Sequence, residues 1–197
     1  MRAIKTAIMV PVLALLLAAT GCETPAPEPV FPDLTFAHLT PIGIDVSTIK
    51  VIENYVSPMR APNVEHEFPV SPGKATLYWA KRRFRATGSV RRGQVIIQDA
   101  SVTATPLNVK KGVTGLFSNE QSVRYDARIQ VRIEVTSPVG GRSSFATATV
   151  KRSRTAAEEI SLNERHQLFF DLVSALLEDL DAAAVKNVRQ HMSQDLR

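Results

Sequence analysis

Apolar and polar positions alternate most regularly between residues 123 and 135. Seven apolar residues fall on one face, and six polar or charged residues fall on the other. The apolar positions are Val123, Tyr125, Ala127, Ile129, Val131, Ile133 and Val135. A period of two predicts a β-strand with one face on a core and the other in water. A register slip of one residue would bury three arginines, so the register is strongly specified.

Three further segments have the composition of strands. Residues 41–55 are rich in β-branched side chains, and residues 94–105 precede a proline. Residues 143–151 follow a Ser-Pro-Val-Gly-Gly turn, so we expect them to form a hairpin with the alternating strand. The stretch from 56 to 70 contains three prolines and predicts a loop.

Two segments have helical spacing. Ser71 and Pro72 are favourable at the start of a helix, and Gly88 is expected to close it. Its apolar positions are Leu77, Tyr78, Ala80 and Phe84. A second helix begins at a capping-box sequence, Ser161 to Glu164, and is expected to run to about Gln190. Its apolar stripe consists of Leu162, His166, Phe169, Leu172, Val173, Leu176, Leu177 and Leu180.

The expected order of elements is therefore β-α-β-β-β-α. It predicts an α+β two-layer sandwich, with two helices on one face of a mostly antiparallel four-stranded sheet. At 1.5 Å per residue the second helix is about 45 Å long, so its end is expected to protrude or fray. We expect residues 41–197 to form a single domain.

Composition narrows the class of protein. Of 197 residues, 44% are hydrophobic and 22% are charged, which excludes a disordered chain, a collagen-like repeat and a polytopic membrane protein. The formal net charge is +5, and it falls to +3 if the residues before position 22 are removed, since these include Arg2 and Lys5 but no acid. This weak positive charge does not require a polyanionic partner, and we expect the protein not to bind nucleic acid.

The first residues have the order of a secretion signal. Arg2 and Lys5 precede an uncharged run, residues 7–19, which is too short to cross a bilayer. Small residues then lead to Cys22, the only cysteine, so no disulfide forms within the chain. The cysteine is left to pair between chains, to stay free or to be modified.

Ala19-Thr20-Gly21-Cys22 resembles the lipobox of bacterial lipoproteins, with Ala19 where leucine is usual. The resemblance implies that residues 1–21 are removed and that Cys22 carries diacylglycerol and an N-acyl chain such as palmitate. It also implies outer-membrane sorting, because Glu23 rather than aspartate follows the cysteine. The alternative is a plain secretory signal with an incidental cysteine.

Residues 22–40 are expected to form the lipidated cysteine and a tether. Glu23 to Pro32 contains four prolines, which favour an extended polyproline II conformation spanning roughly 30 Å. Such a tether lets the domain stand off a membrane and meet a partner.

Catalytic motifs are missing from the sequence. It contains no P-loop, G-x-S-x-G or H-E-x-x-H pattern. Glu65-His66-Glu67 resembles a ligand set, but neighbouring residues of an extended loop diverge, so we expect a solvated loop and no metal. His166 is expected to be partly buried and hydrogen-bonded, and Glu178, Asp179 and Asp181 to form a solvated face. We expect no enzyme and no cofactor apart from the covalent lipid; a hydrolase with an unrecognised site stays open.

Two groups of residues are candidates for partner binding. Lys81, Arg82 and Arg85 form a basic run that suits an anionic lipid, lipopolysaccharide or an acidic protein; a solvated helix face is the alternative. Leu116 and Phe117 lie in a polar, glycine-flanked segment. Such apolar residues at a loop tip contact a protein or a membrane, or else fold back over the sheet edge.

In element order and lipobox, the chain resembles small periplasm-facing lipoproteins that assist envelope transport, including lipopolysaccharide-assembly lipoproteins and auxiliary lipoproteins of lipid-trafficking transporters. The resemblance implies a lipid-anchored outer-membrane protein that acts as a non-enzymatic adaptor or assembly factor and binds another envelope protein. The alternative is a lipid- or glycolipid-binding component of a transport system. A cavity between helices and sheet would favour this alternative, and a packed interior would count against it.

Replacing Leu116 and Phe117 with serine is expected to abolish pull-down of the partner and to leave the melting temperature unchanged. A large fall in melting temperature would show instead that both side chains belong to the core.

Overall fold

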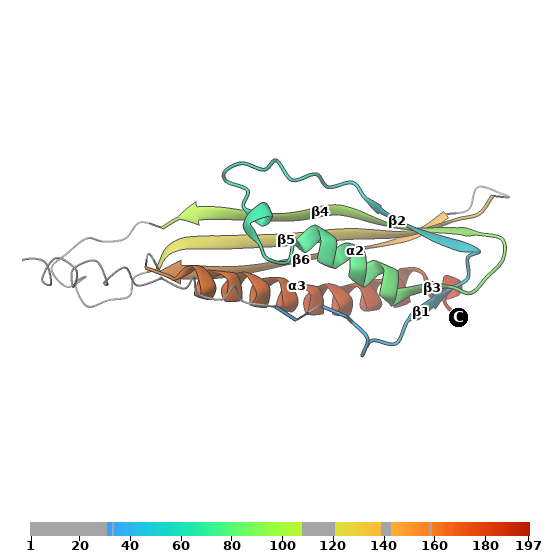
Figure 1. Ribbon diagram of the computed structural model, residues 1–197. Helices are drawn as coiled ribbons and strands as arrows, with labels where there is room; N and C mark the ends of the chain where they lie inside the picture. Colours follow the sequence, from blue (N-terminus) through green and yellow to red (C-terminus); the bar gives the residue numbers. More distant parts are fainter. Residues whose placement is uncertain (1–30, 33, 108–120, 139–142, 158) are drawn as a thin grey trace, which may run out of the picture.

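The computed structural model describes residues 31–32, 34–107, 121–138, 143–157 and 159–197 (Figure 1). Its helices are α2 (Pro72–Arg83) and α3 (Leu162–His191), with single 3-10 turns at Glu65–Glu67 and Ser193–Asp195. Its strands are β1 (Ile42–Ile44), β2 (Thr48–Glu53), β3 (Phe84–Ala86), β4 (Arg92–Pro106), β5 (Gln121–Thr136) and β6 (Ser143–Ala157). The predicted signal peptide, Cys22, Leu116 and Phe117 lie outside the described residues.

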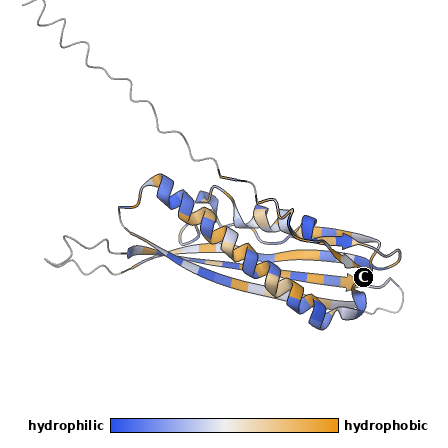
Figure 2. Cartoon of the chain, turned by 90° about the horizontal axis from the view of Figure 1, so that it is seen from below, coloured by the Kyte–Doolittle hydropathy of each residue, from blue (hydrophilic) through white to orange (hydrophobic). Residues whose placement is uncertain are grey.

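The predicted α+β class is confirmed. A four-stranded sheet has the order β2-β4-β5-β6, in which only the β2–β4 pair is parallel. Both helices pack on the same face of this sheet and bury their side chains in one continuous core (Figures 1 and 2). A second sheet contains only β1 and β3, in parallel.

The alternation that predicted β5 is confirmed residue by residue. Every second side chain from Tyr125 to Val135 is buried, and the side chains between them are partly exposed on the opposite face. Burying an aliphatic side chain contributes about 1.5–3 kcal/mol over leaving it exposed, so this register is fixed by the core.

The strand expected over residues 41–55 is divided. β1 ends at Ile44 and β2 begins at Thr48, and the two belong to different sheets. The break is set by Asp45, whose carboxylate pairs with Arg91 at 2.8 Å and with Arg197 at 3.1 Å. The richness of residues 41–55 in β-branched side chains did not predict this break, because the partners of Asp45 lie far away in the chain.

The helix expected to close at Gly88 ends at Arg83. The next three residues pair with β1 as β3, with Phe84 opposite Ile42. Gly88 instead allows a close approach to the backbone of Asp45. A Cβ at position 88 would lie 2.7 Å from the carbonyl carbon of Asp45, which is too close for any other residue. The apolar stripe was also wrong at one position: Tyr78 is exposed, while its neighbour Trp79 is fully buried.

The predicted capping box of α3 is confirmed. The Ser161 hydroxyl accepts from the Glu164 N–H at 3.3 Å, and the Glu164 carboxylate accepts from the Ser161 N–H at 3.0 Å. The expected stripe is buried, except that Leu162 is exposed. The helix does not outrun the sheet, because β4, β5 and β6 contain 15 or 16 residues each, or about 50 Å.

A buried carboxylate fixes the loop between β2 and α2. Beyond Ile97, the edge of β4 that faces β2 has no strand partner, and the loop takes this place: the Val64 N–H donates to Val102 O, and the Ala104 N–H donates to Pro62 O. Glu65, 4% exposed, accepts from the Val102 N–H at 3.2 Å. Its carboxylate thus replaces a strand carbonyl at the sheet edge.

Burial alone would raise the pKa of Glu65. The hydrogen bonds that it accepts from the Tyr55 hydroxyl and the Val102 N–H outweigh this effect, so its pKa lies below the ordinary 4.5. Burial and the nearby Glu65 carboxylate raise the pKa of Tyr55. Tyr55 therefore stays a neutral donor to an ionised Glu65.

Glu65→Gln is expected to lower the free energy of unfolding by about 1–3 kcal/mol at neutral pH, because the Tyr55 hydroxyl and the Val102 N–H lose a charged acceptor. Since the folded-state pKa is depressed, the wild-type advantage is present above the ordinary pKa of 4.5 and is lost as the pH falls below this value and through the lower pKa of the folded state. Urea titrations in a series of buffers measure this difference. The exposed Glu67→Gln is the control; an equal loss in both variants would contradict the role of Glu65.

Candidate functional site

The basic run predicted to bind a partner lies on the solvent side of α2 and β3. Lys81, Arg82 and Arg85 are all exposed. Arg82 donates to the Tyr78 hydroxyl at 3.0 Å and lies over its ring, 5.4 Å from the centroid. The three side chains therefore form an open cationic face and do not enclose a ligand.

Arg83, in the middle of this run, points the other way, toward α3. Its guanidinium donates to Asp181 at 2.6 and 3.2 Å and also to the backbone carbonyl of Thr40. The same carboxylate accepts from the indole N–H of Trp79 at 2.9 Å. Asp181 therefore joins both helices through a buried tryptophan and a nearly buried arginine; we name Trp79, Arg83 and Asp181 the interhelix brace.

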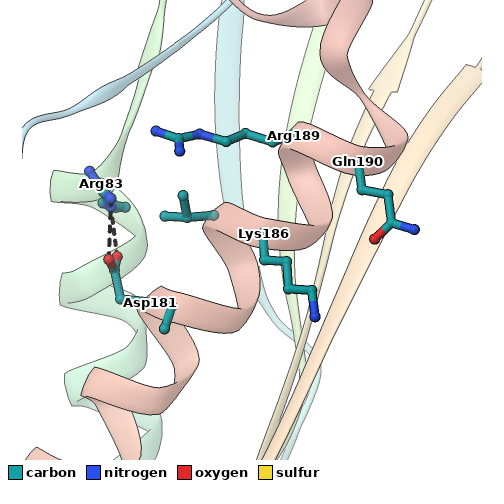
Figure 3. A pocket seen from close by; sticks show the side chains of 7 residues that line it. Arg83, Asp181, Lys186, Arg189 and Gln190 are labelled. Carbon is teal, nitrogen blue, oxygen red and sulfur yellow. Dashed lines mark hydrogen bonds and ion pairs between the residues drawn. The ribbon is translucent and has the colours of Figure 1, made fainter.

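Two hollows lie beside the brace, on the surface between the end of α2 and the last turns of α3. The first, about 630 Å³, is lined by the residues in Figure 3, including Arg83, Asp181, Lys186 and Arg189. The second, about 390 Å³, is lined by residues 38–43, by the chain end at Leu196 and Arg197, and by parts of both helices. Both hollows share Arg83, Val185 and Arg189, and we call the two together the basic groove.

The basic groove has an excess of positive charge. Its walls contain four cationic side chains, Arg83, Lys186, Arg189 and Arg197, and a single carboxylate, Asp181. That carboxylate is already engaged by Arg83. Within the part of the chain that the structure describes, Lys186 and Arg189 have no hydrogen bond or ion pair. The C-terminal dipole of α3 favours cations in its last turn, which is where Arg189 lies.

The apolar walls of the basic groove lie close to the charges. Val185 and Val188 contribute from α3, and Leu39 and Ile42 contribute from the segment that leads into β1. Figure 3 shows Arg189 extending from α3 toward the side of Arg83, while Lys186 and Gln190 extend in another direction. The arrangement combines free cations with an apolar wall, which suits a ligand having both carboxylate and aliphatic groups.

The cations on the open face of the sheet are arranged differently. Along β5 they are paired: Arg124 with Asp126 at 2.8 Å, and Arg132 with Glu134 at 3.1 Å. Arg128 bonds Asp99 of β4 at 2.9 Å. These pairs neutralise the open face along β5, whereas the exposed cations Lys50, Arg92 and Lys151 on the neighbouring strands have no ion pair among the described residues. The basic groove differs from this face because its free cations lie beside an apolar wall.

The predicted solvated loop at Glu65-His66-Glu67 is wrong for its first residue. Glu65 is buried and accepts from the Val102 N–H and the Tyr55 hydroxyl, whereas His66 and Glu67 are exposed. Among the described residues, no group of three histidine, cysteine or acidic side chains is placed to hold a metal ion. His166 lies at the end of α3 away from the basic groove, edge-on to Phe31 with ring centroids 6.5 Å apart.

The predicted solvated acidic face of α3 is wrong for two of its three members. Glu178 is exposed, but Asp179 accepts from Arg152 of β6 at 2.5 and 2.9 Å. The Arg152 hydrogen bond lowers the pKa of Asp179, and this carboxylate joins α3 to the edge strand. Asp181 belongs to the interhelix brace.

The sequence interpretation missed Arg83, Lys186 and Arg189. Arg83 was hidden within a run of equal charges, of which only the exposed members were named. For Arg189 the sequence contained a signal: Asp181, Val185 and Arg189 are spaced by four and therefore share one face of α3. The sequence did not show that this face meets the end of α2.

No helix in the described part of the chain is both long and apolar enough to cross a membrane.

No protein-family model matches the chain, and no curated protein matches it. Solved structures resemble it in part. A minor lipoprotein from Acinetobacter baumannii is 14% identical, over 78% of this chain and 96% of that one, with a TM-score of 0.35. A Xanthomonas campestris protein assigned to DUF330 is 8% identical, over 82% and 92%, with a TM-score of 0.36. A PelC dodecamer from Paraburkholderia phytofirmans is 12% identical, over 70% and 87%, with a TM-score of 0.23. At these values the likeness carries no inference about function, which rests on the residues of this chain.

Asp181→Ala is expected to lower the free energy of unfolding by about 2–4 kcal/mol. The substitution removes the carboxylate that accepts from the Trp79 N–H and the Arg83 guanidinium, and both donors are largely buried. Urea denaturation measures the loss. Glu178→Ala, an exposed carboxylate on the same helix, is the control and is expected to cost less than about 0.5 kcal/mol. Equal losses for the two variants would rule out the brace as a joint between the helices.

Proposed function

We propose that this chain is a lipid-anchored bacterial envelope protein that acts as a non-enzymatic adaptor or assembly factor and binds another envelope protein. Acyl chains on Cys22 hold it to the outer membrane, and its domain faces the periplasm. Each buried methylene of such chains contributes about 0.8 kcal/mol to membrane binding, so several chains hold a protein durably. No metal or resident cofactor takes part in this function.

The observation that supports an adaptor best is the packed interior of the domain. The space between the helices and the sheet is filled by side chains with no more than 1% exposure, among them Trp79, Phe169, Leu176 and Leu180. Both hollows of the basic groove lie on the outside. A carrier that encloses an acyl chain needs an apolar cavity, and here the corresponding volume belongs to the core. Recognition is therefore assigned to the surface.

The segment after the proline-rich stretch supports a domain held close to its anchor. Phe31 stacks on Phe170 of α3, with ring centroids 5.2 Å apart, and Leu34, Phe36 and Leu39 pack against the core. Eight residues separate Cys22 from Phe31. In a polyproline II conformation they span about 25 Å, which sets the reach of the domain from the membrane surface.

A second candidate function is binding of an anionic lipid or lipopolysaccharide at the surface. The basic groove favours it, because unpaired cations beside Val185 and Leu39 match a headgroup with an adjoining alkyl chain. In this alternative the protein is an auxiliary component of envelope transport.

Metabolic labelling with palmitate tests the anchor. The wild-type protein is expected to incorporate label and to fractionate with the outer membrane, while Cys22→Ser incorporates none, because no other thiol is present to be acylated. Thr24→Ser, two residues away, is the control and keeps the label. An unlabelled wild-type protein would contradict the anchor.

Lipid analysis separates the two candidate functions. Protein purified in a neutral detergent is expected to yield, on solvent extraction, much less than one phospholipid or glycolipid per chain, because the interior is filled. Close to one lipid per chain would contradict the adaptor and favour the transport component.

A further inference from the structure

We propose that the basic groove is the contact site of this protein for an acidic, partly apolar segment of its protein partner. The inference deepens the proposed adaptor function and rests on it for the identity of the partner as a protein.

Lys186 and Arg189 supply the free charges. Both side chains are exposed, and neither has a partner among the described residues. The other two cations of the walls, Arg83 and Arg197, are already paired with Asp181 and Asp45, so the free charge of the groove comes from Lys186 and Arg189. Carboxylates are the acceptors that arginine binds in a bidentate way, so a segment with repeated aspartate or glutamate matches this set. The apolar walls formed by Val185 and Leu39 suit aliphatic side chains between the acids.

The interhelix brace keeps Arg83 in one conformation. Its Nε and one terminal nitrogen bond Asp181, and its other terminal nitrogen bonds the Thr40 carbonyl. Arg83 therefore sets the shape of the groove and loses little conformational freedom when a partner arrives. Its own charge is met by Asp181, so the attraction of an acidic partner depends on Lys186 and Arg189.

The groove lies at the end of α3 away from the contact between Phe31 and Phe170. Phe31 packs on Phe170, and Arg189 follows 19 residues later in the same helix, which is about 28 Å along its axis. Figure 1 shows the chain from residue 31 running along α3 toward β1, so it meets the domain at one end of α3 and reaches the groove at the other, where residues 38–43 form part of the wall. This placement favours a partner that approaches from the periplasm over the headgroups of the anchoring membrane.

A peptide-binding experiment tests the proposal. The probe is a fluorescent peptide of alternating glutamate and valine, titrated with full-length protein in a neutral detergent, and a matching peptide with glutamine in place of glutamate is the reference. The wild type is expected to bind the acidic peptide and not the neutral one, with affinity that falls as salt is added.

Two double variants with the same loss of charge locate the site. Lys186→Gln with Arg189→Gln is expected to weaken binding by about tenfold or more, because it removes the free charged donors. Lys81→Gln with Arg85→Gln changes the exposed face of α2 and is expected to stay within about twofold. All four side chains are exposed, so both variants should fold, and circular dichroism checks this.

Three outcomes would overturn the proposal. Equal binding by the wild type and the groove variant would show that these cations serve only the helix dipole. Loss of binding in the α2 variant alone would move the site to Lys81 and Arg85. Groove-dependent binding of phosphatidylglycerol vesicles without binding of the peptide would assign the groove to lipid. None of these outcomes depends on acylation of Cys22, so failure of the groove and failure of the anchor are distinguishable.

Discussion

The fold depends on the packing of α3 against the long strands β5 and β6. A 30-residue helix lies along strands of matching length, and its stripe from Phe169 to Val188 is buried throughout. Each fully buried aliphatic side chain contributes about 1.5–3 kcal/mol relative to exposure, before the entropy of ordering is subtracted. α2 completes the layer with Trp79, which reaches the same core and bonds Asp181 of α3. The position of both helices relative to the sheet, and with it the position of the basic groove, follows from this one apolar layer.

Because the core is filled by side chains, we place the proposed partner recognition on the outside of the molecule. The interhelix brace closes the seam between the helices, and just beyond it the surface is hollowed and positively charged. The sheet face opposite carries paired charges, and its exposed Phe145 is covered in part by Arg132, whose guanidinium lies 3.6 Å from the ring centroid. Where the helices end, the unpaired cations Lys186 and Arg189 lie beside apolar side chains.

Sequence patterns predicted the elements whose cause is local. The period of two in β5 and the capping box at Ser161 required no knowledge of the rest of the chain. The divided first strand and the short helix α2 could not be predicted, because Asp45 is held by Arg91 and Arg197, and Phe84 pairs with Ile42. The basic groove was missed for the same reason: its walls come from three separate parts of the sequence.

The side chains between the helices and the sheet are buried in one core, and the recognition that we propose is placed on the surface. Xenon is neutral and enters apolar cavities, so it probes the interior without responding to the charges of the groove. In NMR spectra of the protein under xenon pressure, the methyl groups of Leu172, Leu176 and Leu180 are expected to show no saturable shift. Saturable shifts at these methyl groups would reveal an internal cavity and contradict the account.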